Sequence, residues 1–309
     1  IDINIYVKMY LFHTGVIMKT KTLLIAIYLA SFLGCLDLTI VNTALPSIHH
    51  NLAVPLNLLQ WVMTGLLLAL AASMVLVGRL ADAYGYRRLL LNGLWIFGLA
   101  SLLAAVAMHI QLLIAARILQ GVGIAILYTA PMTAINHLFP KDKIAKAMGL
   151  YFAVCTLGIA SGPLLGGFIL YALNWHWIFF LNIPIVIFSW IICYMWLPKQ
   201  EFEQHERFDI WGAIVSALGL LSLLLFTTHM GAWGLLSFKS LGFLSAAIIL
   251  LGAFIYIEKK QPAPMLNLTL FHYDTFSIGG ICNIGLAAFY CVAFFMMPLY
   301  LHIVRGFDN

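Results

Sequence analysis

Two residues of opposite charge lie inside apolar stretches of the chain, where a charge is energetically expensive. Asp37 lies near the end of an apolar run that begins at Thr22, and Arg117 lies in a second run over residues 113–123. Insertion scales place the cost of a mid-membrane Asp at roughly 2.5–3.5 kcal/mol, and such residues usually mark proton or ion pathways. We therefore interpret the pair as a candidate proton-coupling site. Two simpler interpretations remain: Asp37 caps a helix, and Arg117 extends to the nearer membrane interface.

Polar neighbours surround Arg117 on its own predicted helix. Helical spacing places Gln120 and Tyr128 on the same stripe as Arg117, so a cation, an amide and a phenol share one face. At a rise of 1.5 Å per residue, Asp37 and Arg117 both lie about 9–12 Å below the outer membrane boundary. We expect the two to meet across the bundle, directly or through water.

The composition identifies the broad class of protein. Hydrophobic residues make up 63% of the 309 residues and charged residues 9%, too few charges to cover a soluble domain of this length. The sequence therefore predicts an all-α, polytopic membrane protein. Its basic residues are scattered singly between apolar stretches, which argues against nucleic-acid binding. The five cysteines are odd in number and lack CxxC spacing, so we expect neither a disulfide framework nor a metal site.

The elements that must position Asp37 and Arg117 are predicted membrane-spanning helices. Nine apolar runs approach the roughly 20 residues that a bilayer requires. They cover residues 22–45, 57–79, 89–109, 111–136, 145–172, 177–197, 210–229, 240–257 and 275–303. With a cytoplasmic N-terminus, of the 16 basic residues only Lys239 and Arg305 lie outside and Arg117 lies within a span. This positive-inside bias predicts that the N-terminus is cytoplasmic. We expect residues 1–21 to be an extension whose natural start is Met18.

A charged connector follows the second predicted span. It carries Gly78, Asp82, Gly85, Arg87 and Arg88, and we interpret it as a tight cytoplasmic turn that forms a charged latch. An ordinary positive-inside loop would explain the two arginines but not the spaced glycines or the acid.

The fifth predicted span is rich in glycine around one proline. Gly158, Gly162, Pro163, Gly166 and Gly167 would let a neighbouring helix approach closely, and the proline would bend the helix. Generic packing glycines are the simpler interpretation.

These motifs together resemble one transporter family. The connector after span two, the Arg117 segment and the Gly158 to Gly167 segment are similar to motifs of the major facilitator superfamily. The stretch from Asp37 through Asn42 to Pro46 resembles the first-span motif of its fourteen-helix drug/proton antiporters of the EmrB and QacA type. A Trp-rich segment with His176 and Asn182 also fits that group.

The resemblance implies a domain organisation, and the chain departs from the family's connector and Trp-rich motifs at three positions. It implies an N-terminal six-helix bundle over residues 22–198, a cytoplasmic connector with two accessory helices over 199–260, and the first helix of a truncated C-terminal bundle over 261–309. Ala83 and Tyr86 replace usual basic residues of the connector, and His176 replaces an Arg.

The resemblance also implies residue roles. It links Asp37 and Asn42 to proton or substrate recognition, and Arg117 with Gln120 and Tyr128 to proton coupling. The connector would lock one side of the alternating-access cycle, and the glycine-proline segment would serve as hinge and seal.

The implied activity is proton-driven efflux of small apolar or cationic compounds through the inner (plasma) membrane. A proton gradient, not a cofactor, supplies the energy, and the implied partners are the lipid bilayer, protons, substrates and a periplasmic adaptor. Alternatives are a proton-coupled uptake carrier and a non-transporting membrane fragment or sensor. Because no nucleophile elbow, metal-binding His pair or phosphate loop is present, we do not expect an enzyme. Since the chain holds one half of such a transporter, we expect it not to transport alone.

Overall fold

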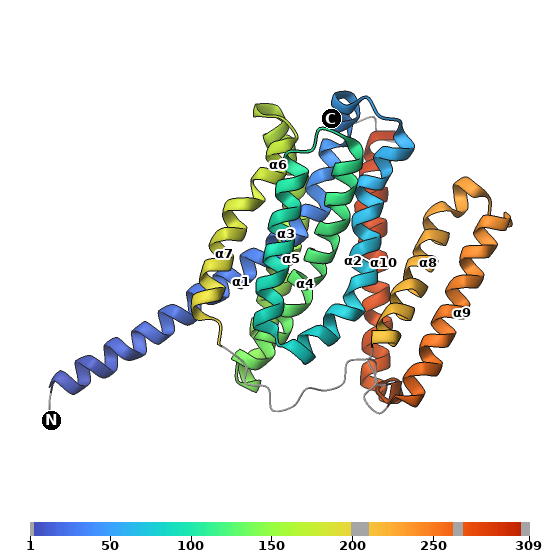
Figure 1. Cartoon of the computed structure of the whole chain (residues 1–309). Coiled ribbons are helices and arrows are strands. Elements are labelled where there is room, and N and C mark those ends of the chain that lie inside the picture. The colour runs from blue at the N-terminus through green and yellow to red at the C-terminus, as the bar shows by residue number, and fades with distance from the viewer. Residues whose placement is uncertain (1–2, 199–209, 262–267, 304–309) are drawn as a thin grey trace. The chain divides into compact units, whose positions relative to one another are not determined.

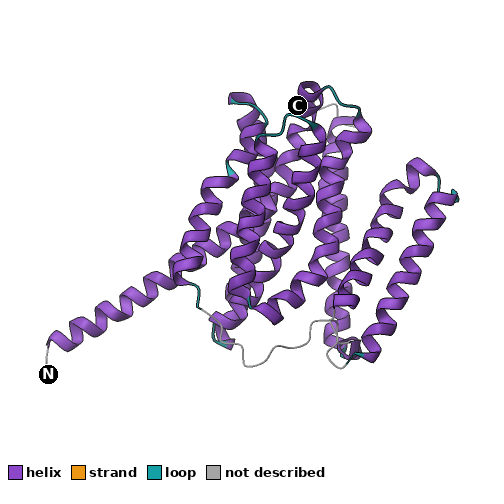
Figure 2. Cartoon of the chain, viewed as in Figure 1, coloured by secondary structure: helices purple, strands orange, loops and turns teal. Residues whose placement is uncertain are grey.

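The chain is almost entirely helical over the part that the computed structural model describes, residues 3–198, 210–261 and 268–303, and short loops join the helices (Figure 2). No strand occurs in these ranges. The helices are α1 (Ile3–Leu52), α2 (Leu56–Tyr84), α3 (Tyr86–Ala105), α4 (Ile110–Leu138), α5 (Lys141–Ala172), α6 (His176–Phe180), α7 (Asn182–Trp196), α8 (Ile210–Trp233), α9 (Phe238–Lys260) and α10 (Asp274–Ile303), with a 3₁₀ helix over Leu268–His272. The predicted connector at 199–209 and the predicted outer residue Arg305 lie outside the described residues.

Eight of these segments are long and apolar enough to cross a membrane, counted over the described residues. They correspond to the first eight predicted spans, and the prediction of an all-helical, polytopic membrane protein is confirmed. The sixth span is divided by a break at Leu181 into α6 and α7. The ninth predicted span coincides with α10, of which Asp274–Phe289 counts as a shorter apolar helix.

The chain divides into two compact units, Ile1–Phe254 and Ile255–Asn309. The first contains α1 to α8 and most of α9, and the second contains the end of α9, the 3₁₀ helix and α10. All the candidate site residues lie in the first unit. The domain boundaries expected from the sequence remain predictions.

Helix α1 is longer than the sequence analysis indicated. We expected it to end near Pro46, but the helix continues through this proline to Leu52, and Ala53 then adopts a positive φ of 49°. A proline removes one backbone hydrogen bond and bends a helix without necessarily ending it. Because Ile48 is fully buried beyond Pro46, packing holds the last turn in place.

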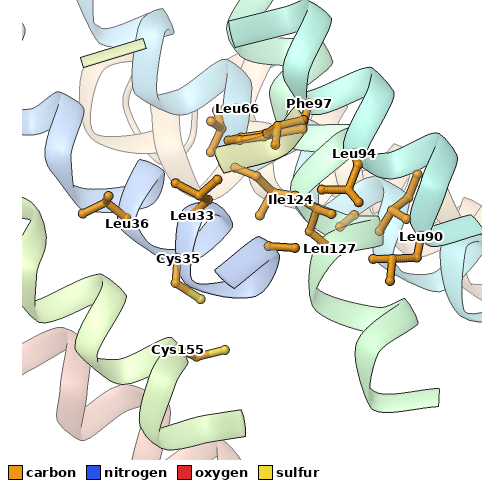
Figure 3. Packing of buried hydrophobic residues seen from close by; sticks show 14 of the residues in the cluster. Leu33, Cys35, Leu36, Leu66, Leu90, Leu94, Phe97, Ile124, Leu127 and Cys155 are labelled. Carbon is orange, nitrogen blue, oxygen red and sulfur yellow. The ribbon is translucent and has the colours of Figure 1, made fainter. Parts of the chain in front are cut away.

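Within the first unit, α4 packs against α2, α3 and α1, while α1 packs most extensively against α5 (Figure 1). Glycines allow these close approaches. A Cβ atom added to Gly121 would lie 2.4 Å from the Leu66 carbonyl oxygen in α2, and one added to Gly123 would lie 2.9 Å from Phe97 Cβ in α3. The apolar core between these helices includes Leu33, Leu66, Phe97 and Ile124 (Figure 3).

Candidate functional site

The structure brings Asp37 and Arg117 together, as their predicted membrane depth suggested. Asp37 in α1 and Arg117 in α4 are both fully buried, and Arg117 Nη1 forms an ion pair with Asp37 Oδ2. Arg117 therefore does not extend to a membrane interface. A charge buried in this way is tolerated only when it is paired and hydrogen-bonded.

The rest of the guanidinium group is also in contact with acceptors. Its Nε donates to the carbonyl oxygen of Val62 in α2 at 3.2 Å, and Nη1 donates to Gln120 Oε1 at 2.9 Å. Nη2 lies 3.4 Å from the backbone oxygen of Asp37, and the group lies over the ring of Phe179 at 5.8 Å. The arginine thus connects α1, α2 and α4 at one point.

The second oxygen of the Asp37 carboxylate accepts from two amides. Gln120 Nε2 lies 3.4 Å and Asn182 Nδ2 3.3 Å from Asp37 Oδ1. Both amides also donate to Ser101 Oγ in α3, at 2.9 Å from Gln120 and 3.4 Å from Asn182. The result is a buried polar cluster of Asp37, Arg117, Gln120, Asn182 and Ser101, in which neutral donors hold the carboxylate in addition to the cation.

Sequence reasoning did not assign Asn182 and Ser101 to this site. Each is a small polar residue within an apolar run, and both are buried. A neutral amide in such a run needs a hydrogen-bond partner, and this need was the available signal for Asn182. A lone serine carries little signal, because its hydroxyl can bond its own helix.

Two residues of the predicted site lie elsewhere. Asn42 is exposed in α1, and Tyr128 is half-buried in α4, where its backbone oxygen accepts from Tyr151 Oη at 2.8 Å. Tyr128 follows Arg117 by three turns, about 16 Å along the helix axis, so a shared stripe does not bring it into contact with the ion pair. Neither residue belongs to the buried polar cluster, and their predicted roles in coupling or substrate recognition stay predictions.

The predicted cytoplasmic turn is shorter than expected. Gly78 lies inside α2, and Gly85 alone separates α2 from α3, with a φ of 84° that suits glycine. Arg87 Nη2 donates to the backbone oxygen of Tyr194 in α7 at 2.6 Å, whereas Arg88 is exposed. Asp82 lies in the last turns of α2, and its side chain is not among those that the structure describes.

The glycine-proline segment of α5 packs against α1. A Cβ added to Gly158, Gly162 or Gly166 would come within 2.7 Å of the Phe32 backbone oxygen, 2.0 Å of Thr39 Oγ1 or 2.1 Å of Thr43 Oγ1. Gly167 has no atom within 4 Å of such a Cβ and is not part of this contact. We call the contact of Gly158, Gly162 and Gly166 with α1 the glycine seam. Whether it moves as a hinge stays a prediction.

A separate groove of about 400 Å³ lies between α3 and α7. Its lining is entirely apolar and includes Trp95, Leu99, Val186 and Trp190, and none of the five residues of the buried polar cluster lines it. A surface of this kind suits lipid tails rather than proton transfer.

The fold and site define a helical integral membrane protein with a charged pair in the interior of its bundle. The chain belongs to the Major Facilitator Superfamily, whose pattern it matches over residues 27–308.

Known proteins of several kinds are similar to it. The chain is 35% identical over 289 residues to the multidrug transporter protein MdtP of Bacillus subtilis, covering 91% of this chain and 53% of MdtP. It is 34% identical over 293 residues to the riboflavin transporter RibZ of Clostridioides difficile, covering 94% of this chain and 62% of RibZ. The chain thus spans about half to three-fifths of the length of these relatives.

Solved structures share the fold at low sequence identity. The proton:xylose symporter XylE superposes with a TM-score of 0.57 at 12% identity, covering 91% of this chain and 62% of XylE. The peptide transporter POT gives a TM-score of 0.56 at 14% identity, covering 77% of this chain and 52% of that structure.

Proposed function

We propose that this chain forms part of a proton-coupled exporter of small apolar or cationic molecules, in which Asp37 and Arg117 couple proton movement to transport. The observation that carries the proposal is the fully buried ion pair between α1 and α4, held by two further amide donors. Intramembrane ionisable residues of this kind mark proton and ion pathways. Family membership and the names of relatives such as the tetracenomycin C resistance and export protein of Streptomyces glaucescens support a transporter rather than an enzyme.

The cluster suggests how a proton changes the structure. While Asp37 is ionised, Arg117 has a counter-charge and α1 is held against α4. A proton on the carboxylate removes this charge and leaves a buried arginine without a counter-charge, which strongly favours a rearrangement that rehydrates the arginine. Entry of water or of a cationic substrate next to Asp37 would favour loss of the proton again.

The energy available is sufficient for export. Each proton that enters down the membrane potential supplies about 2.3 kcal/mol per 100 mV. Since about 1.4 kcal/mol corresponds to a tenfold gradient, one proton at that potential supports a gradient of about fortyfold for an uncharged substrate.

The proposal places the protein in the plasma membrane with a cytoplasmic N-terminus. It also includes the second half of the transporter, because transporters of this type bind substrate between two halves that move against each other. The finer assignment to the fourteen-helix drug/proton antiporters is part of this proposal.

The test replaces the carboxylate by an amide in the protein encoded by the full reading frame. In everted membrane vesicles, Asp37→Asn should abolish proton-driven uptake of a fluorescent cationic dye while the protein stays in the membrane. Asp142→Asn makes the same chemical change at an exposed acid in α5 and should transport normally. Full proton-dependent transport by Asp37→Asn would refute the coupling role.

The same vesicles separate export from uptake. An exporter accumulates dye inside everted vesicles when their interior is acidified, and collapsing the proton gradient releases it. A proton-coupled uptake carrier would instead drive its substrate out of these vesicles.

A further inference from the structure

Two helices that pack against α1 each contain a proline, and each therefore lacks one internal hydrogen bond. Pro131 in α4 has no N–H for the carbonyl of Leu127, and Pro163 in α5 has none for the carbonyl of Ile159. In a membrane interior, where water is scarce, an unsatisfied backbone carbonyl is costly. Each of these carbonyls needs another donor.

Both missing donors come from α1. Ser31 Oγ donates to the Leu127 oxygen at 3.1 Å, and Thr39 Oγ1 donates to the Ile159 oxygen at 2.9 Å. Gly162 lies against Thr39, and the absence of a Cβ there leaves room for the hydroxyl to reach α5. The two hydroxyls thus meet the two carbonyls that proline leaves free in α4 and α5.

Each hydroxyl also has an acceptor within α1. Ser31 Oγ lies 3.2 Å from the Ile27 oxygen, and Thr39 Oγ1 lies 3.3 Å from the Leu36 oxygen. Because a hydroxyl has one proton, it fully serves one acceptor at a time. A small rotation therefore exchanges a bond between helices for a bond within α1.

We propose that Ser31 and Thr39 are positioning residues. They hold α4 and α5 against α1 at the carbonyls that the prolines leave free, and thereby keep Asp37 opposite Arg117. Ser31 precedes Asp37 by less than two turns and Thr39 follows it by two residues, so the bonds hold α1 on both sides of the carboxylate. We call these two hydrogen bonds between helices the bracing. The bracing is independent of the proposed function, whereas its effect on proton coupling rests on that function.

Thr43 provides a matched control. It lies on α1 against the same glycine seam, where a Cβ on Gly166 would meet its hydroxyl at 2.1 Å. Its hydroxyl donates to the Ile40 oxygen of its own helix at 2.7 Å. Replacing Thr43 by valine therefore changes the seam in the same way but removes no bond between helices.

The first experiment is a double-mutant cycle on thermal stability, measured in detergent with the full protein. Thr39→Val should lower the Tm by about 1–4 °C, the range expected for one hydrogen bond between membrane helices, and Thr39→Ser should restore it. Thr43→Val should have a smaller effect. In a Pro163→Ala background, which restores the N–H that pairs with Ile159, Thr39→Val should cost much less. Ser31→Ala with Pro131→Ala should behave in the same way.

The results can overturn the proposal at clear points. If Thr39→Val lowers the Tm equally with and without Pro163, Thr39 does not compensate for the proline. The same conclusion follows if Thr39→Val lowers the Tm by no more than Thr43→Val does. The same reasoning applies to Ser31 and Pro131.

The second experiment measures the pH at which transport is half-maximal. Thr39→Val should displace this pH from its wild-type value, because the loss of the bond to α5 leaves Asp37 less well aligned with Arg117. Thr39→Ser should restore the wild-type profile, and Thr43→Val should leave it unchanged. An unchanged profile for Thr39→Val would limit Thr39 to a structural role and refute the positioning.

The two proposals can fail separately. If Asp37→Asn transports normally but the stability cycle shows coupling, the bracing stands and the proposed function fails. If Asp37→Asn abolishes proton coupling but the double-mutant cycle shows no coupling between Thr39 and Pro163, the bracing alone fails.

Discussion

Helices α1 and α9 are about equally apolar, yet they occupy opposite kinds of environment. In its most apolar stretch of 18 residues, α1 is 67% buried, whereas α9 is 17% buried. Helix α1 carries a buried acid and contacts glycines of α5, while α9 exposes Ile248 and Ile249. Hydropathy therefore predicts that a helix crosses the membrane, and polar residues with small neighbours decide which helix lies inside the bundle.

The strongest test of this contrast breaks the ion pair of α1. Asp37→Leu leaves Arg117 as a buried charge without a partner and should reduce the free energy of unfolding by about 3–5 kcal/mol. Arg117→Met should cost less, because a lone carboxyl group can take up a proton whereas arginine cannot lose one. Reversible unfolding in mixed micelles measures both.

The double variant Asp37→Leu/Arg117→Met completes this test. Since an apolar pair of similar volume often replaces a buried ion pair at little cost, it should be more stable than either single variant. A double variant as unstable as Asp37→Leu would show that the pair itself is not what makes the substitution costly.

The glycine seam gives the next largest effect. A Cβ at Gly162 would overlap Thr39 Oγ1 and lie 2.9 Å from the backbone nitrogen of Ile40, so Gly162→Ala should cost about 3 kcal/mol, the upper end for overpacking. Gly167→Ala is the matched control in the same helix, and it should be neutral or stabilising by up to about 1 kcal/mol. Equal destabilisation by both variants would contradict the assignment of the seam. Thermal unfolding in detergent separates them.

The smallest expected effect compares a core isoleucine with an exposed one. Ile124 in α4 is 1% exposed and Ile248 in α9 is 65% exposed. Ile124→Ala should cost about 2 kcal/mol, the low end for a core truncation, because lipid rather than water surrounds the bundle. Ile248→Ala should stay within about 0.5 kcal/mol. The same unfolding measurement applies, and similar losses at the two positions would remove the distinction between the core of the bundle and α9.

The membrane-spanning elements were predictable because each is a long apolar run. The pairing of Asp37 with Arg117 was also predictable from depth, since two opposite charges in lipid have few other ways to be satisfied. Residue roles in transport are not tested by the geometry and stay predictions.

The remainder of the site depends on packing that the sequence pattern does not contain. Asn182 reaches Asp37 because α7 packs beside α1, and Ser101 reaches the amides of Gln120 and Asn182 because α3 packs beside α4 and α7. Tyr128 shares a helical stripe with Arg117 but lies too far along the helix to contact it. Gly78 looked like the start of a turn, yet the residues between Gly78 and Gly85 continue α2, and only the positive φ of Gly85 separates the helices.

The ion pair also sets a requirement on biosynthesis. Arg117 follows Asp37 by 80 residues, so α1 enters the membrane before its counter-charge has been made. At about 5–20 residues per second, the carboxylate waits about 4–16 s for the arginine. During that interval only the surrounding apolar residues of α1 offset its insertion cost, and residues 22–52 carry no other Asp, Glu, Lys or Arg that would add to this cost.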